Sequence, residues 1–314
     1  MFRIGIDIGA TRIKAGLIKQ GAVVRTLIKT LRPEDKSEDG IIELVNATVK
    51  AILAETKVQK KEIEWVGIGA PGFVMADTGV IFRSPNFPLW KDFPLAKRAM
   101  ERIGFKVFLD NDANCVTLGE AFYGAGKGQT DFVLLTLGSG VGGGLFLNGK
   151  LYRGADGMAG EIGHMVVEPK GYECGCGSRG CLEQYASFCG LRNMALETQI
   201  FGDKTKEMAE NPDLPRILYE MAKTGDSGAR SLFARMGYYL GLAISNLVLV
   251  FNCHLVVLCG GIARALDMFE KDMRDCLQSR LPLSFLEGTR VVTGELWEEA
   301  GILGSSALGQ ERFC

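Results

Sequence analysis

Apolar and polar residues follow two spacings along this chain, one typical of buried strands and the other of helices. Short apolar runs bounded by polar or glycine-rich segments predict strands, and they occur at residues 2–7, 65–68, 107–109, 254–258 and 290–293. Apolar residues at helical spacing predict helices, and this spacing covers residues 40–56, 113–122, 230–250, 266–277 and 301–312. Strands and helices that alternate in this way favour an α/β fold with mixed sheets.

One pattern of apolar runs and turns occurs twice. Residues 3–24 and residues 132–152 both read as an apolar run, a turn of small and hydroxyl residues, a second apolar run and a second turn. In the later copy the second turn contains Asn148-Gly149, a strong signal for a two-residue hairpin. Two copies of one hairpin indicate two related domains with a cleft between them.

The length of 314 residues is enough for two domains, each with its own core. We expect a smaller N-terminal domain over residues 1–115 and a larger domain over residues 116–300. The closing helix over residues 301–314 is expected to join the smaller domain.

Composition excludes several classes of partner. The formal net charge is −1, so no long-range field favours nucleic acid or an anionic membrane. The chain enters a strand pattern at Phe2, which leaves no room for a signal peptide. The most apolar run, residues 240–251, contains Ser245 and Asn246 and is too short to span a bilayer. Nine cysteines, an odd number, fit a reducing cytosol. We therefore expect a soluble cytoplasmic protein with no nucleic-acid or membrane partner.

A cluster of metal-ligand residues lies in the middle of the chain. His164, Cys174, Cys176 and Cys181 fall within eighteen residues of a chain that has only two histidines. Three thiolates and one imidazole make the ligand set of a closed, tetrahedral, structural zinc site. The alternatives are a disulfide or free thiols. The spacing of these residues predicts zinc.

The turn of the first hairpin has the features of a phosphate-binding loop. Gly9 and Ala10 are small enough to let backbone amides approach a phosphate, and the hydroxyl of Thr11 adds a donor. Asp7, at the end of a buried strand, is suited to hold Mg²⁺ through water. The alternative is an ordinary glycine-containing hairpin turn, which this motif alone does not exclude.

The turn of the second hairpin is richer in glycine. Residues 138–144 contain five glycines among seven residues, and ordering each costs about 0.5–1 kcal/mol relative to alanine in regular structure. Such a cost indicates close backbone contact with an anion, whereas the alternative is a set of tight turns with a bulge. The segment matches neither a Walker loop nor a Rossmann fingerprint.

Carboxylates suited to proton transfer and sugar binding lie near these motifs. Asp112 follows an apolar run and precedes a helix, so it can accept a hydroxyl proton during phosphoryl transfer while Asn111 binds the sugar. The alternative role for both residues, and for Asp110, is helix capping. Glu161 and Glu183 flank the metal ligands and can accept hydrogen bonds from vicinal sugar hydroxyls, or can be solvated surface charges.

Five segments together resemble the ROK family of sugar kinases and related repressors. Residues 7–11 and 137–144 are similar to its two phosphate motifs, 154–165 to its sugar-and-zinc segment, and 174–183 to its cysteine motif. Gly260-Gly261-Ile262 resembles its loop on the adenosine side. The resemblance covers essentially the whole chain. It implies two related actin/hexokinase-like (RNase H-like) α/β domains.

The resemblance also implies an activity. Members of this family phosphorylate a hexose with ATP, usually on the 6-hydroxyl, and a glucokinase is the simplest expectation for this chain. ATP with Mg²⁺ would be the phosphoryl donor, Zn²⁺ would be structural, and a homodimer or homotetramer is expected.

Site residues are carried over from the matching motifs. Asp112 would be the catalytic base, and His164 would use one ring nitrogen for the metal and the other for the sugar. The residues implied in substrate binding are Asn86, Asn111, Asp112, Glu161, His164 and Glu183. Those implied in binding ATP and its phosphates are Asp7, Gly9, Ala10, Thr11, Lys14, Thr136, Gly138, Ser139, Gly140, Gly260 and Gly261.

Three positions depart from the family's pattern, and alternatives follow. Ala10 replaces a glycine, Ser139 a threonine, and Cys259 a glycine, but Ala10 is still small and Ser139 keeps a hydroxyl.

Kinases for allose, fructose, N-acetylglucosamine or N-acetylmannosamine stay open as alternative functions, because the sequence does not give the shape of the pocket. A sugar-responsive repressor is less expected, since only six residues precede Asp7 and no basic patch is present. A sugar-binding protein without catalysis is the third class.

Overall fold

The computed structural model describes residues 1–313, and contacts within the chain group them into two compact units. Unit 1 contains residues 1–130, 144–160 and 295–313, and unit 2 contains residues 131–143 and 161–294. The first division therefore falls later than the boundary expected after residue 115. Its cause is the packing of helix α3 (Asp112–Tyr123) against helix α11 (Ala300–Phe313), which keeps α3 in unit 1.

The core of unit 1 is a five-stranded sheet in the order β3-β2-β1-β4-β8. Its strands are β1 (Phe2–Ile8), β2 (Arg12–Lys19), β3 (Ala22–Thr30), β4 (Ile63–Ala70) and β8 (Val107–Asn111). β1, β2 and β3 pair antiparallel as successive hairpins, whereas β1, β4 and β8 run parallel. In this register Asp7 and Asp110 are both aligned with Gly69, so the carboxyl ends of three strands meet at one edge.

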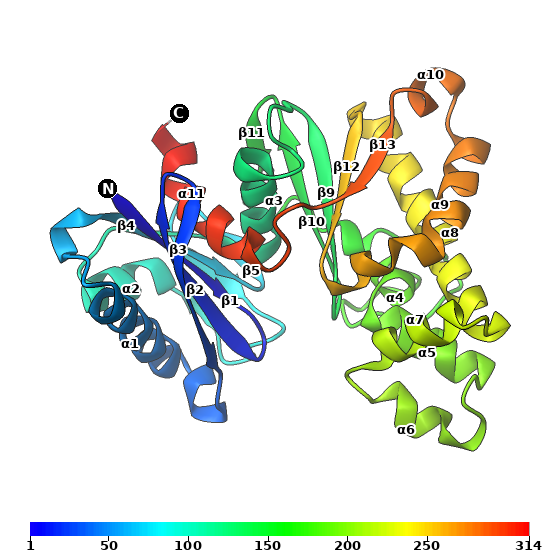
Figure 1. Cartoon of the computed structure of the whole chain (residues 1–314), viewed down its shortest axis with the longest axis horizontal. Coiled ribbons are helices and arrows are strands. Elements are labelled where there is room, and N and C mark those ends of the chain that lie inside the picture. Colours follow the sequence, from blue (N-terminus) through cyan, green and yellow to red (C-terminus); the bar gives the residue numbers. More distant parts are fainter. Residues whose placement is uncertain (314) are drawn as a thin grey trace. The chain divides into compact units, whose positions relative to one another are not determined.

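Helix α11 packs directly on the backbone of this sheet, as Figure 1 shows in red against the blue strands. A Cβ atom at Gly5 would lie 1.9 Å from the carbonyl oxygen of Ile302, and one at Gly67 would lie 1.7 Å from that of Ser305. The indole Nε1 of Trp65 donates to the carbonyl oxygen of Ser306 at 2.9 Å. Glycine is therefore required in both strands, because any side chain would push the helix away from the carboxyl edge.

Helices α1 and α2 contribute to the core of unit 1 as well. α1 (Glu38–Thr56) is capped by Ser37, whose hydroxyl accepts from the amide of Gly40 at 3.0 Å. It packs on α2 (Leu95–Ile103), which ends at Gly104 in the left-handed conformation. Three short strands, β5 (Phe73–Met75), β6 (Val80–Arg83) and β7 (Lys91–Phe93), form a separate small sheet.

The second large sheet has the order β11-β10-β9-β12-β13. Its strands are β9 (Phe132–Leu137), β10 (Val141–Leu147), β11 (Lys150–Tyr152), β12 (Leu255–Cys259) and β13 (Arg290–Thr293). β12 runs parallel to β9 and to β13, and β10 pairs antiparallel with β11. Asn148 and Gly149 join β10 to β11 with φ values of 53° and 73°, the positive values that a two-residue hairpin turn requires. The predicted hairpin is confirmed.

Helix α8 (Ser227–Phe251) is the long buried helix that the sequence predicts, and it packs against α9 (Leu266–Arg280). With 25 residues it is longer than the apolar run at 240–251, so by length and hydropathy alone it is able to span a membrane. However, 61% of its most apolar window is buried within the protein, as in the core helix of a soluble domain. The remaining helices are α4 (Glu183–Ala186), α5 (Phe188–Thr198), α6 (Thr205–Ala209), α7 (Leu214–Lys223) and α10 (Leu283–Leu286).

Candidate active site and metal centre

Two carboxylates lie at the carboxyl edge of the unit 1 sheet. Asp7 stands near the end of β1, and Asp112 begins α3 directly after β8. Burial raises the pKa of Asp7 to about 6, and the negative charge of Asp112 adds to this, while Lys14 and Arg12 oppose it. Burial also raises the pKa of Asp112, although the amide of Ala113 donates to its carboxylate at 2.9 Å. The pair is suited to accept a proton and to bind a hard cation.

Asn111 caps helix α3. Its Oδ1 accepts from the amides of Ala113 at 2.8 Å and Asn114 at 3.2 Å, and its Nδ2 donates to the carbonyl oxygen of Gly72 at 3.0 Å. Helix capping, the alternative role predicted for Asn111, is confirmed. One N–H of its amide is not used by these bonds, so a sugar contact through that N–H stays a prediction.

The first predicted phosphate turn is closed by a hydrogen bond from the amide of Gly9 to the carbonyl oxygen of Arg12 at 2.9 Å. Lys14 is buried, and its ammonium group pairs with the carboxylate of Glu298 and with the carbonyl oxygen of Glu298 at 3.3 Å. Arg12 lies 3.6 Å from the same carboxylate. Glu298, which sequence reasoning missed, thus places a negative group beside Lys14, the cation predicted to meet phosphate, and beside Arg12.

Three other predicted residues of unit 1 lie in turns between strands. Ala10 and Thr11 form the bend between β1 and β2, where Thr11 is exposed. Asn86 is exposed in the turn between β6 and β7. The roles given to these three residues remain predictions.

In unit 2, the second glycine-rich turn is organised by its own side chains and by Glu183. The amide of Gly142 donates to the hydroxyl of Thr136 at 3.2 Å, and the amide of Val141 donates to the carboxylate of Glu183 at 3.1 Å. A Cβ atom at Gly140 would lie 2.2 Å from that carboxylate. Gly140 is therefore required for the close approach of Glu183, a reason that the sequence alone did not suggest.

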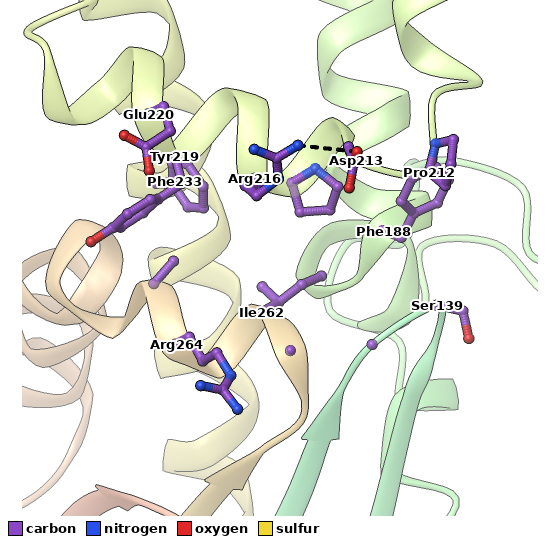
Figure 2. Close-up of a pocket in the computed structure, with 14 residues that line it drawn as sticks. Ser139, Phe188, Pro212, Asp213, Arg216, Tyr219, Glu220, Phe233, Ile262 and Arg264 are labelled. Carbon is purple, nitrogen blue, oxygen red and sulfur yellow. Dashed lines mark hydrogen bonds and ion pairs between the residues drawn. The ribbon is translucent and has the colours of Figure 1, made fainter. Parts of the chain in front are cut away.

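A cavity of about 780 Å³ opens beside this turn, within the size range of small-molecule sites. Figure 2 shows Ser139 and Ile262 among the residues that line it. Gly260 has a φ of 87°, and a Cβ atom there would lie 2.4 Å from the carbonyl oxygen of Leu137. This close approach brings Gly261 to the cavity wall. The other lining residues are Gly138, Phe188, Pro212, Asp213, Pro215, Arg216, Tyr219, Glu220, Phe233, Arg264 and Ala265.

The four predicted metal ligands converge in unit 2. The ligand atoms of His164, Cys174, Cys176 and Cys181 all lie within 4.8 Å of one another. Cys174 Sγ is 3.7 Å from His164 Nδ1, and Cys176 Sγ is 3.7 Å from Cys181 Sγ. A tetrahedral ion with Zn–S bonds of about 2.3 Å would hold two sulfurs about 3.8 Å apart. The donor set and its spacing fit zinc.

Residues around the ligands orient them. His164 Nε2 lies 3.8 Å from the carboxylate of Glu161, so the two ring nitrogens face different partners. The amide of Gln184 donates to Cys174 Sγ at 3.6 Å, and Asn193 donates to Gln184 Oε1 at 3.0 Å. Hydrogen bonds of this kind position metal ligands. Sequence reasoning missed Gln184 and Asn193, because their approach depends on the turn between α4 and α5.

Comparison with known proteins places the chain in a family. A model of the ROK family matches residues 3–312. The glucokinase of Thermotoga maritima is 36% identical over 315 residues, which cover 99% of this chain and 98% of that protein. The crystal structure of a ROK family glucokinase from Streptomyces griseus in complex with glucose and AMPPNP has a TM-score of 0.79 and 32% identity. It covers 98% of this chain and 99% of that one.

A regulatory protein is also among the relatives. The xylose repressor of Bacillus subtilis is 28% identical over 317 residues, which cover 99% of this chain and 78% of the repressor.

The similarity to the Streptomyces griseus structure confirms the predicted α/β fold with two actin/hexokinase-like domains.

Proposed function

The chain belongs to the ROK family, and we propose that it is an ATP-dependent hexose kinase that phosphorylates the 6-hydroxyl of glucose. The observation that carries the proposal is the pair Asp7 and Asp112 at one sheet edge, both with a raised pKa. Glucokinase relatives of nearly the same length support glucose as the substrate.

Asp112 is the catalytic base of the proposed reaction. It accepts the proton of the sugar hydroxyl as the oxygen attacks the terminal phosphorus of ATP. Burial raises its pKa, which makes its carboxylate a stronger proton acceptor. Asn111, held at the helix cap, directs its remaining N–H to a sugar hydroxyl.

In the proposed reaction, residues of the two hairpin turns bind the phosphates of ATP and the cation. Asp7, with a pKa of about 6, is mostly ionised at neutral pH and supplies the hard oxygen that Mg²⁺ prefers. Mg²⁺ bound with ATP neutralises charge on the phosphates. The proposed contacts of ATP are Gly9, Ala10, Thr11, Lys14, Thr136, Gly138, Ser139, Gly140, Gly260 and Gly261. The cavity beside Ser139 and Ile262 suits the apolar faces of a nucleoside.

Sugar binding is assigned to the segment around the metal centre. Glu161 and Glu183 accept from vicinal hydroxyls, and His164 binds the sugar through Nε2. Asn86, in the turn between β6 and β7, is a further proposed contact of the sugar. His164, Cys174, Cys176 and Cys181 would hold zinc, which would keep this segment in shape and take no part in phosphoryl transfer. A cytoplasmic location and a homodimeric or homotetrameric assembly complete the proposal.

The substitution Glu183→Gln tests the sugar assignment. It should raise the KM for glucose about tenfold or more, since a hydrogen bond to a charged group is worth about 1.5–3 kcal/mol. The KM for ATP should stay within about twofold, because the new amide oxygen can still accept from Val141. Initial rates at varied glucose and ATP separate the two effects. The matched control is Glu173→Gln, which removes an exposed carboxylate directly before Cys174. Equal weakening of sugar and ATP would assign Glu183 to the phosphate turn instead.

An ADP-release assay with Mg²⁺·ATP tests the function itself. The panel is glucose, mannose, allose, fructose, N-acetylglucosamine and N-acetylmannosamine, and we expect glucose to give the highest kcat/KM. A clear preference for another hexose would keep the kinase and change its substrate. No turnover of any sugar by folded, zinc-loaded protein would favour a sugar sensor, as the repressor relatives suggest.

A further inference from the structure

We propose that Arg153 and Glu311 are positioning residues for catalysis, which tie the last described turns of helix α11 to the segment that carries Asp112. The proposal rests on the proposed role of Asp112 as base. It makes the end of the chain, far from the reacting atoms in sequence, a determinant of turnover. All the residues involved belong to unit 1.

The chain of contacts begins at Asp110, a fully buried carboxylate that the proposed reaction does not use. Arg153 Nε donates to Asp110 Oδ2 at 2.7 Å. The side chain of Arg153 is 20% exposed and that of Asp110 is 0% exposed. Water therefore screens this ion pair little, in contrast to a surface salt bridge.

Glu311 fixes the other side of the guanidinium group. Arg153 Nη1 donates to Glu311 Oε1 at 2.9 Å, and Arg153 Nη2 donates to Glu311 Oε2 at 2.6 Å. This bidentate pair holds the plane of the guanidinium, which a single hydrogen bond would not do. Glu311 is itself only 10% exposed. The orientation of Arg153, and through it that of Asp110, thus depends on helix α11.

Asp110 in turn restrains the segment that contains Asn111 and Asp112. Its Oδ1 accepts from the backbone amide of Asn111 at 2.7 Å and from Nδ2 of Asn114 at 2.8 Å. The first bond fixes the peptide group that joins Asp110 to Asn111, and Asp112 follows that peptide by one residue. A rotation of this peptide would move both the sugar-binding amide of Asn111 and the carboxylate of Asp112.

The magnitude follows from the geometry that proton transfer needs. The base must lie within hydrogen-bonding distance of the hydroxyl, and a displacement of about 1 Å at a reacting group can cost about 100-fold in rate. With Glu311 removed, Arg153 keeps Asp110 but loses the partner that sets its plane. We expect kcat to fall about 10-fold to 100-fold in Glu311→Gln, with a smaller rise in the KM for glucose, because Asn111 moves too, and with the KM for ATP within about twofold of wild type.

A matched control lies one residue earlier in the same helix. Gln310 Oε1 accepts from Arg3 Nη1 at 2.7 Å and from the hydroxyl of Tyr123, at the last residue of α3, at 3.5 Å. It therefore also ties α11 to the rest of unit 1, but neither of these bonds reaches residues 110–112. Gln310→Ala should lower the melting temperature measurably, since it removes a hydrogen bond between α11 and β1, while kcat per folded enzyme stays within about twofold. A purely structural role of Glu311 predicts the same result for both variants.

The experiment measures kcat, both KM values and the melting temperature for the zinc-loaded full chain carrying Glu311→Gln, Arg153→Lys, both changes, or Gln310→Ala. Arg153→Lys keeps the positive charge but loses the two parallel hydrogen bonds that the guanidinium makes to Glu311. If the two residues act as one unit, kcat of the double variant should fall no further than kcat of the more impaired single variant. Should Glu311→Gln fail to fold, Arg153→Lys alone decides, and unchanged kcat in it overturns the proposal. Turnover of Glu311→Gln at the wild-type rate, or an equal loss in Gln310→Ala, also overturns it. Absence of turnover in the wild type would instead remove the kinase function.

Discussion

Asp112→Asn should lower kcat at least about 100-fold while glucose and ATP still bind with affinities close to those of the wild type. General-base catalysis contributes about 10²–10⁴-fold in rate, and asparagine keeps the size and the hydrogen bond from Ala113 but cannot accept the proton. Burial raises the pKa of Asp112, so its substitution removes a strong proton acceptor without leaving a buried charge unpaired. The kcat is measured by ADP release, and binding by calorimetry with glucose and with a non-hydrolysable ATP analogue.

Asp92→Asn is the control for this variant. Asp92 is an exposed residue of unit 1 with a φ of 49°, a conformation that asparagine adopts readily. The change removes one carboxylate without altering the fold or the site. If Asp112→Asn retains more than a few per cent of the turnover, Asp112 is not the base, and Asp7, whose pKa is also raised, becomes the candidate.

Local patterns in the sequence predict the elements that local forces stabilise. The Asn148-Gly149 turn is specified by two residues that accept positive φ, and the structure contains it. The buried helix α8 is predicted by the helical spacing of apolar residues within its own segment, without knowledge of what it packs against. Strands β5, β6 and β7 went unpredicted, because runs of three or four residues between turns carry too little periodicity.

The site divides in the same way. The four metal ligands are close in sequence, so their spacing predicts a cluster that the structure contains. Glu298 reaches Lys14 across 284 positions of sequence, and Glu311 reaches Arg153 across 158. No local pattern predicts such pairs, since they depend on how α11 returns to the sheet. The same return explains why α3 belongs to unit 1, although it follows the boundary expected after residue 115.

Zinc should be present at about one ion per chain, and its loss should weaken sugar binding more than any other property. Burial and the neighbouring thiols raise the pKa of Cys181, so a nearby cation is needed to keep it as a thiolate at neutral pH. Cys181→Ser removes one of four ligands and leaves a gap that a hydroxyl fills poorly. We expect the zinc content to fall below about 0.2 per chain and the melting temperature to fall by at least about 5 °C.

The kinetic consequence separates a structural metal from a catalytic one. Glu161 and His164 lie 3.8 Å apart in the segment that the proposed zinc would hold, so the KM for glucose should rise about 10-fold or more while the KM for ATP changes little. Metal analysis, melting with and without a chelator, and initial rates measure the three effects. Cys189→Ser is the control, since Cys189 lies in the neighbouring helix α5 and outside the four-ligand group. Purified wild-type protein that contains no zinc and is fully active would contradict this prediction, because the sugar-binding segment would then be ordered without a metal ion.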